Sequence, residues 1–253
     1  MISICSITHK QRDFLDTWAK GLIDQDYKDF EINLVIDEES LEEGLLTAKI
    51  VRNLFRDTDI EANGKLKIRV NRENLGGPAS MTKSISMAQG DYIGILECDD
   101  YYLPNKLSES IQFIESNKLD GCHHDIDCIL PDGEYRVAAW SKTCWQESRV
   151  TYERLCQMNT IYTCSFLCKS YMVKTAPSPL EISKHFSFLG DYVLFLDLVK
   201  NQRAKLGWLD KSLSVYRDSV GINLTKRDES VIMDGRIRDW AARGCDRSIF
   251  YGQ

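Results

Sequence analysis

Three carboxylates stand within four positions at the end of the stretch GDYIGILECDD, where Glu97, Asp99 and Asp100 follow the apolar run 92–96. Like charges this close repel one another, and a buried carboxylate also loses the hydration that stabilises its charge. Hard cations favour oxygen ligands, and Mg²⁺ commonly takes only one or two protein carboxylates and completes its shell with phosphates and water. The cluster is therefore suited to holding a divalent cation. The alternative from sequence alone is a solvated turn that caps the next helix.

Apolar runs and helical patterns alternate in the first hundred residues, and polar residues follow each run. This alternation predicts a mainly parallel sheet covered by helices on both faces, and such sheets bind ligands at the carboxyl ends of their strands. The predicted strands are 2–7, 31–36, 65–70 and 92–96, and the predicted helices are 11–24, 40–55 and 78–88. The residues expected at the shared edge are Thr8, His9, Asp37, Asn71, Asn74, Glu97, Cys98 and Asp99.

Local signals mark two of these helices. Ser40 and Glu43 have the Ser-x-x-Glu spacing of a capping box, which predicts a helix start there, and Pro78 suits the first turn of a helix. The second half is less regular: we expect strands at 122–130, 134–137, 204–209 and 212–217 and helices near 151–158 and 191–200. The charged tail from 226 is expected to be a docking helix or partly mobile.

Composition excludes several classes of protein. The chain has 253 residues and a formal net charge of −6, which argues against a generic binder of polyanions. No run approaches the roughly 18 apolar residues of a membrane span, and the N-terminus lacks the pattern of a signal peptide. We therefore expect a cytoplasmic protein. Its nine cysteines form no Cys-x-x-Cys pair, so small buried side chains in a reducing compartment are favoured over disulfides.

Four segments in order resemble the family 2 glycosyltransferases. They are ISICSITHKQRDFLDTWAKGLIDQDYKDFEI, DEES, NLGGPASMTKSISMAQGDYIGILECDDYYLPNKL and GDYVLFLDLVKNQRAKLGWLDKSLSVYRDS, which together span about 2–222. The chain departs from the family pattern at Glu97, at Met81 and Thr82, at Gly190 and at Asp218. Glu97 replaces the first aspartate of the Asp-x-Asp motif, and Gly190 stands where a glutamate usually precedes the aspartate of the catalytic helix.

The resemblance implies a GT-A fold that uses a nucleotide-sugar donor, with UDP-sugar expected. It divides the chain into a nucleotide-sugar-binding half at 1–100, an acceptor-binding and catalytic half of the same domain at 101–225, and a tail at 226–253. Asp99 would hold Mn²⁺ or Mg²⁺, and Glu97 would reach the ribose. Asp191 would be the general base of an inverting transfer, with a simple helix-start aspartate as its alternative. The nucleotide-sugar-binding residues implied are Thr8, His9, Asp37, Asn74, Glu97, Cys98 and Asp99.

The acceptor side is less defined. His124 and Asp125 are candidate acceptor contacts, as is Trp140, for which core packing is the equal alternative. Zinc is disfavoured because consecutive histidines on a strand face opposite ways. The acceptor hydroxyl could belong to a glycan, a lipid-linked glycan, a protein or a nucleic acid, and a lipid-linked acceptor would place the protein at the membrane periphery. The other readings are a degenerate glycosyltransferase that only binds, and a nucleotidyltransferase, which SITHKQRD disfavours because it lacks glycine.

Overall fold

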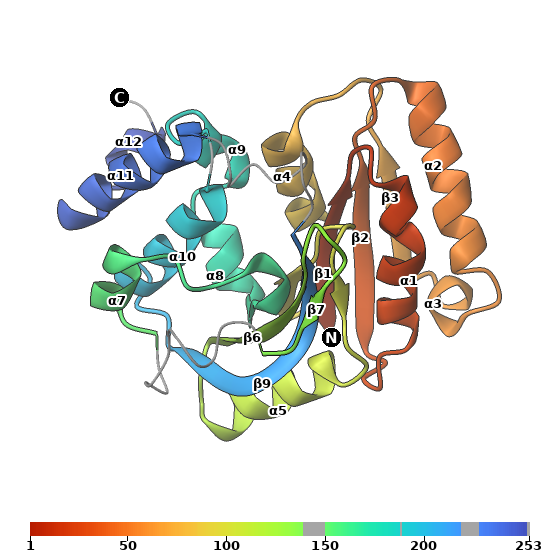
Figure 1. The fold of residues 1–253 in the computed structure, drawn as a ribbon, viewed down its shortest axis with the longest axis horizontal. Coiled ribbons are helices and arrows are strands. Elements are labelled where there is room, and N and C mark those ends of the chain that lie inside the picture. Colours follow the sequence, from red (N-terminus) through yellow and green to blue (C-terminus); the bar gives the residue numbers. More distant parts are fainter. Residues whose placement is uncertain (139–149, 188, 219–227, 252–253) are drawn as a thin grey trace.

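One mixed sheet organises the computed structural model, which describes residues 1–138, 150–187, 189–218 and 228–251 (Figure 1). Within these residues the sheet has nine strands in the order β3-β2-β1-β4-β8-β6-β9-β5, and β7 pairs with β6. The strands are β1 Ile2–Thr8, β2 Phe30–Ile36, β3 Leu66–Val70, β4 Tyr92–Ile95, β5 Tyr101–Tyr102, β6 Gly121–Ile129, β7 Tyr135–Arg136, β8 Leu167–Lys169 and β9 Leu206–Arg217.

The first half of the sheet is parallel, as the sequence pattern predicts. β1 pairs in parallel with β2 and β4, and β2 pairs in parallel with β3. Thr8 lies opposite Ile36, and Ile36 lies opposite Val70, so these three strands end at the same level. The residues after these strands therefore meet at one edge.

The second half of the sheet is mixed. β8 is antiparallel to β4 and to β6, whereas β9 is parallel to β6 and antiparallel to β5. The expectation of two short strands at 204–209 and 212–217 is wrong, because β9 is one strand of twelve residues. His124 pairs with Leu209 and Asp125 with Ser212, so Asp210 and Lys211 bulge out of the register instead of forming a turn.

Helices cover both faces of the sheet (Figure 1). One core packs α1, α2 and α5 against the sheet, and the other packs α4, α8 and α10 against its opposite face. The helices are α1 Leu15–Ile23, α2 Leu41–Leu54, α3 Asp59–Ala62, α4 Gly77–Met87, α5 Lys106–Ser116, α7 Tyr152–Gln157, α8 Ser170–Thr175, α9 Pro179–Ser183, α10 Gly190–Lys200, α11 Asp228–Ala242 and α12 Ser248–Tyr251, with 3₁₀ turns at Arg12–Phe14 and Thr163–Ser165.

The expected start signals act where the sequence placed them. The Ser40 hydroxyl accepts a hydrogen bond from the Glu43 backbone N–H and so caps α2, and Pro78 lies in the first turn of α4. Gly21 in α1 lets that helix approach β5, because a Cβ atom at this position would lie 2.8 Å from the Tyr102 carbonyl oxygen. Among the described residues, no helix combines the length and apolar character needed to cross a bilayer.

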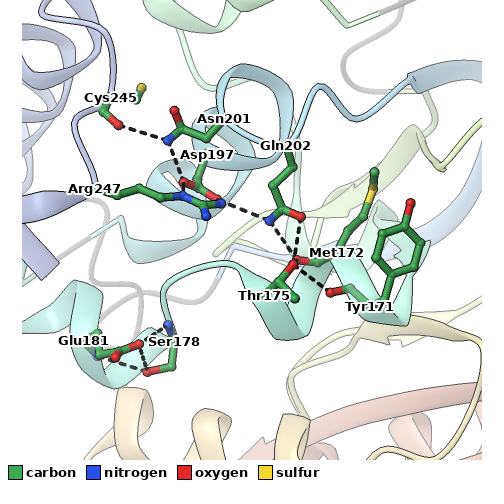
Figure 2. A network of polar contacts seen from close by, with 10 residues as sticks. All are labelled: Tyr171, Met172, Thr175, Ser178, Glu181, Asp197, Asn201, Gln202, Cys245 and Arg247. Atoms are coloured by element: carbon green, nitrogen blue, oxygen red, sulfur yellow. Dashed lines mark hydrogen bonds and ion pairs between the residues drawn. The ribbon is translucent and has the colours of Figure 1, made fainter. Parts of the chain in front are cut away.

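The C-terminal segment contains helix α11 and docks on α10, which agrees with the expectation of a docking helix. Arg247 donates from Nε and Nη2 to the two carboxylate oxygens of Asp197, which is fully buried (Figure 2). Asn201 on the same helix donates to the Cys245 carbonyl oxygen at 2.9 Å. Trp240 and Phe250 of this segment also pack against each other and against Phe186. The segment is therefore part of the core on this face, not a free tail.

Candidate active site

His9, Asp37 and Asn74 meet at the edge of the parallel strands, as the sequence predicts. The Asp37 carbonyl oxygen lies 2.8 Å from His9 Nδ1 and accepts a hydrogen bond from Asn74 Nδ2 at 3.1 Å. Asp37 follows β2 directly and is almost fully buried, whereas His9 is 40% exposed. Thr8 is fully buried at the end of β1. Thr8, His9, Asp37 and Asn74 together form the Asp37 cluster.

The carboxylate of Asp37 is held by residues that the predicted site did not include. Its Oδ1 accepts hydrogen bonds from Asn71 Nδ2 at 2.6 Å and from the Leu75 backbone N–H at 2.9 Å. Asn71 in turn accepts a hydrogen bond from Lys83 Nζ at 2.7 Å. Asn71 was expected at this edge of the sheet, but its pairing with Lys83 on α4 has no sequence signal.

The acidic residues after β4 lie in a poorly hydrated environment. Burial, followed by repulsion from Asp99 and Asp191, raises the pKa of Glu97 to about 8. Burial also raises the pKa of Asp99, with Arg217 opposing the rise, and burial raises the pKa of Asp100 well above its ordinary value. Cys98 is fully buried in the core beneath them. These carboxylates therefore favour either bound protons or a compensating cation.

Arg217, at the end of β9, holds the acidic segment in place. Its backbone N–H donates to Asp100 Oδ1 at 2.8 Å, and its Nε donates to the Asp99 carbonyl oxygen at 3.0 Å. Its guanidinium carbon lies 4.8 Å from the centre of the Phe14 ring. Arg217 belongs to the last of the four segments that resemble the family. Its contacts with the acidic residues have no sequence signal, because they depend on the pairing of β9 with β5.

Asp191 lies close enough to the acidic residues to interact with them. It occupies the first turn of α10, and its negative charge is one of the causes that raise the pKa of Glu97. Burial raises the pKa of Asp191 itself, opposed by hydrogen bonds from backbone groups and from the Asn159 side chain. Asn159 has no sequence signal, because it lies in an irregular loop. The arrangement gives α10 a carboxylate that can accept a proton beside the acidic cluster.

The acidic residues fit a cation that shares its ligands with a diphosphate. Among the described residues, no group of three or more His, Cys, Asp or Glu side chains forms a metal cage. Mg²⁺ commonly takes only one or two carboxylates from a protein when phosphates supply other ligands, and Asp99 can offer one. A bound cation would favour the ionised form of the Glu97 and Asp99 carboxyl groups over the protonated form and so would oppose the rise in their pKa values. Asp99, the predicted ligand, is therefore the residue that would hold it.

The predicted acceptor residues lie in different surroundings. His124 and Asp125 in β6 are 2% and 1% exposed. His124 Nδ1 lies 2.7 Å from the Asp125 carbonyl oxygen, and burial lowers the pKa of His124 well below its ordinary value. Their contact with an acceptor stays a prediction, and they would need a local opening to make it. Trp140 lies outside the described residues.

Comparisons with known proteins support the family and the fold. The model of the family described as glycosyl transferase family 2 matches residues 3–176. An uncharacterized glycosyltransferase of Haemophilus influenzae is 24% identical over 86% of this chain and 79% of its own length. Staphylococcus aureus TarS 1–349, solved with UDP, has a TM-score of 0.68 and 16% identity over 95% of this chain and 64% of that chain. A mannosyltransferase of Pyrobaculum calidifontis, solved with GDP-Man and Mn²⁺, has a TM-score of 0.62 and 12% identity over 97% of this chain and 64% of that chain. These structural likenesses confirm the predicted α/β fold of GT-A type.

Proposed function

Because this chain belongs to glycosyl transferase family 2, we propose that it transfers one sugar from a UDP-sugar donor to an acceptor hydroxyl with inversion. The observation that carries the proposal is the convergence of three groups at one edge of the sheet. The Asp37 cluster follows β1, β2 and β3, the acidic residues follow β4, and Asp191 interacts electrostatically with Glu97. A nucleotide pocket, a diphosphate site and a base are the parts that such a transfer needs.

The nucleotide end of the donor would bind at the Asp37 cluster. Asp37 presents an ordered carboxylate in a nearly dry environment, which strengthens a hydrogen bond to a base N–H. Thr8 and Asn74 lie at the same edge of the sheet, and Glu97, which follows β4, would reach the ribose.

The leaving diphosphate gains negative charge as the sugar departs. A divalent cation, Mn²⁺ or Mg²⁺, would neutralise that charge as a Lewis acid when bound. Asp99 would hold it, and Arg217 keeps Asp99 in position through its bond to the Asp99 carbonyl oxygen. The charge of Arg217 also favours the ionised form of Asp99, because it opposes the rise in the pKa of that carboxyl.

The acceptor hydroxyl must lose a proton as it attacks. Asp191 would take it, because burial raises the pKa of its carboxyl and so makes it a stronger base than an exposed aspartate. The hydrogen bond from Asn159 would orient the carboxylate. The acceptor would be a hydroxyl compound, such as a glycan, a lipid-linked glycan or a protein.

A thermal-shift screen tests the donor and the metal together. UDP-sugars with Mn²⁺ should raise the melting temperature, because a ligand at 100 times its dissociation constant stabilises a protein by about 2.7 kcal/mol. GDP-sugars should raise it less. Asp99→Asn should remove the increment that Mn²⁺ adds and leave the ligand-free melting temperature nearly unchanged.

Asp210→Asn is the matched control, since Asp210 is exposed on the bulge of β9. It should respond to UDP-sugar and Mn²⁺ as the unmodified protein does. An unchanged Mn²⁺ increment in Asp99→Asn would show that the metal is held elsewhere. Slow hydrolysis of the donor with Mn²⁺ would separate an enzyme from a protein that only binds.

A further inference from the structure

Asp37 offers a ligand only one of its two carboxylate oxygens. Its Oδ1 accepts hydrogen bonds from Asn71 Nδ2 at 2.6 Å and from the Leu75 N–H at 2.9 Å. A carboxylate oxygen has two lone pairs, so both acceptor sites of Oδ1 are occupied. Oδ2 accepts no hydrogen bond from any of the described residues. Asp37 is only 2% exposed, so few water molecules can reach Oδ2. A donor on the ligand would therefore supply a hydrogen bond that water provides only poorly.

The orientation of Asn71 is fixed by its other contacts. Its Nδ2 also donates to Ser80 Oγ at 2.9 Å, and its Oδ1 accepts from Lys83 Nζ at 2.7 Å. An ammonium group can only donate, so the amide oxygen of Asn71 must face Lys83 and its NH₂ must face Asp37. Asn71 is 4% exposed and Ser80 is fully buried. The cap on Oδ1 is therefore a built feature of β3 and α4.

Nucleobases differ in how many donors they direct at a carboxylate. Uracil has a single imide N–H between two carbonyl groups. Guanine has a ring N–H beside an exocyclic amino group, and this pair matches a carboxylate with both oxygens available, as other paired donors do. Against a carboxylate with one filled oxygen, the second guanine donor would stay unpaired, which is costly in a buried site.

Building on the UDP-sugar donor proposed above, we propose that Asn71 and Lys83 are positioning residues that set nucleotide specificity. They keep Asp37 as a one-oxygen acceptor, which accepts the imide N–H of uracil and disfavours guanine. Leu75 contributes through its backbone N–H, which every substitution except proline would keep. Lys83 acts through Asn71 and need not touch the nucleotide.

Equilibrium binding of UDP, N3-methyl-UDP and GDP, each with Mn²⁺, tests this proposal. The methyl group removes the imide N–H and leaves the diphosphate unchanged. The unmodified protein should bind UDP about tenfold or more tightly than either analogue, as expected for one unsatisfied buried group. In Asn71→Leu and in Lys83→Met both ratios should fall toward one, mainly because UDP binds more weakly.

Lys83→Met keeps the test decisive if Asn71→Leu does not fold, because the Lys83 residue lies at the surface. Lys20→Met is the matched control, since Lys20 is exposed on α1 and pairs with Asp24. It removes the same charge and should keep both ratios.

The outcomes separate this inference from the proposed function. A protein that prefers UDP, with unchanged ratios in both variants, would overturn the role of Asn71 and Lys83 and leave the transferase proposal intact. Equal or tighter binding of GDP by the unmodified protein would overturn both the one-oxygen argument and the UDP-sugar donor. The expected ratios without any sugar transfer would support this inference and count against the proposed activity.

Discussion

Asp191 is the residue whose replacement should separate binding from transfer. A general base acts only as the sugar moves, so it stabilises the transition state and not the bound donor. Asp191→Asn should bind UDP-sugar normally and lower turnover by about 10²–10⁴-fold. The measurement compares the donor dissociation constant with single-turnover transfer once an acceptor is in hand.

The control for that experiment must lie at a comparable place in a helix. Asp59→Asn is suitable, because Asp59 is exposed in the first turn of α3. It should retain full transfer. Asp197 on α10 is unsuitable as a control, because its carboxylate is fully buried against Arg247. Transfer at the normal rate by Asp191→Asn would assign the base to another residue.

His123 should make the protein sensitive to mild acid. Burial lowers the pKa of this imidazole from 6.5 to about 3. The unfolded chain therefore binds a proton as the pH falls below about 6.5, whereas folded His123 stays neutral until about pH 3. The stability that this group contributes is present above pH 6.5 and is lost progressively as the pH falls from 6.5 toward 3. A drop to about pH 5 should cost about 2 kcal/mol from this group.

His123→Phe removes the imidazole that binds the proton and keeps an aromatic ring beside Trp208. Urea unfolding at pH 7.5 and at pH 5 should show a smaller loss of stability in this variant than in the unmodified protein. His185→Phe, at a partly exposed histidine, should keep the full loss. An unchanged acid sensitivity in His123→Phe would mean that other groups cause it.

Residue roles could be predicted from the chain where they depend on strand ends. Asp37 and Asn74 follow predicted parallel strands, and the shared edge of a parallel sheet brings such residues together whatever the details of packing. Lys83, Asn159 and Arg217 could not be placed this way. Their partners depend on the depth of α4, the path of an irregular loop and the pairing of β9, none of which leaves a periodic pattern.

The close packing of α1 against β5 depends on Gly21. A Cβ atom there would lie 2.8 Å from the Tyr102 carbonyl oxygen and 3.0 Å from its nitrogen. Both are backbone atoms, so the helix would have to shift, and overpacking of this kind costs about 1–3 kcal/mol. Gly21→Ala should lower the free energy of unfolding by that amount in urea titrations.

Gly235→Ala is the opposite case within α11. No atom lies within 4 Å of a Cβ placed there, and alanine is favoured over glycine inside a helix by about 0.5–1 kcal/mol. This substitution should be neutral or stabilising. If both variants behave alike, the close approach of α1 to β5 does not constrain the fold.

Elements with long periodic patterns could be predicted, and short ones could not. β1 to β4 and α1, α2 and α4 form where the sequence places them. β8 has three residues and β5 has two, which is too short to show alternation. β9 was divided wrongly because Asp210 and Lys211 look like a polar turn, whereas the register with β6 absorbs them as a bulge.

At the scale of the whole molecule, the ion pair between Asp197 and Arg247 joins the C-terminal segment to the helix that carries Asp191 (Figure 2). Arg247→Ala would leave the Asp197 carboxylate buried without its cation, and breaking a buried pair in this way costs about 3–5 kcal/mol. The 30% exposure of Arg247 places the expected loss at the lower end. Chemical unfolding measures it directly.

The double variant Asp197→Leu with Arg247→Ala removes the unpaired charge. It should be more stable than Arg247→Ala alone, because a buried pair replaced by apolar groups leaves no isolated ion. A double variant as unstable as the single one would show that the loss comes from packing and not from charge.

The buried cysteines can report which part of the folded core opens to solvent. Seven of the described cysteines are buried, and burial raises the pKa of Cys5 to about 12 and that of Cys122 to about 11. The thiolate is the form that attacks alkylating reagents, so these thiols should stay unlabelled until the surrounding core separates. Cys5 and Cys122 lie on strands in the two halves of the sheet. Their labelling rates, read by mass spectrometry, would therefore tell whether the two halves open together or one at a time.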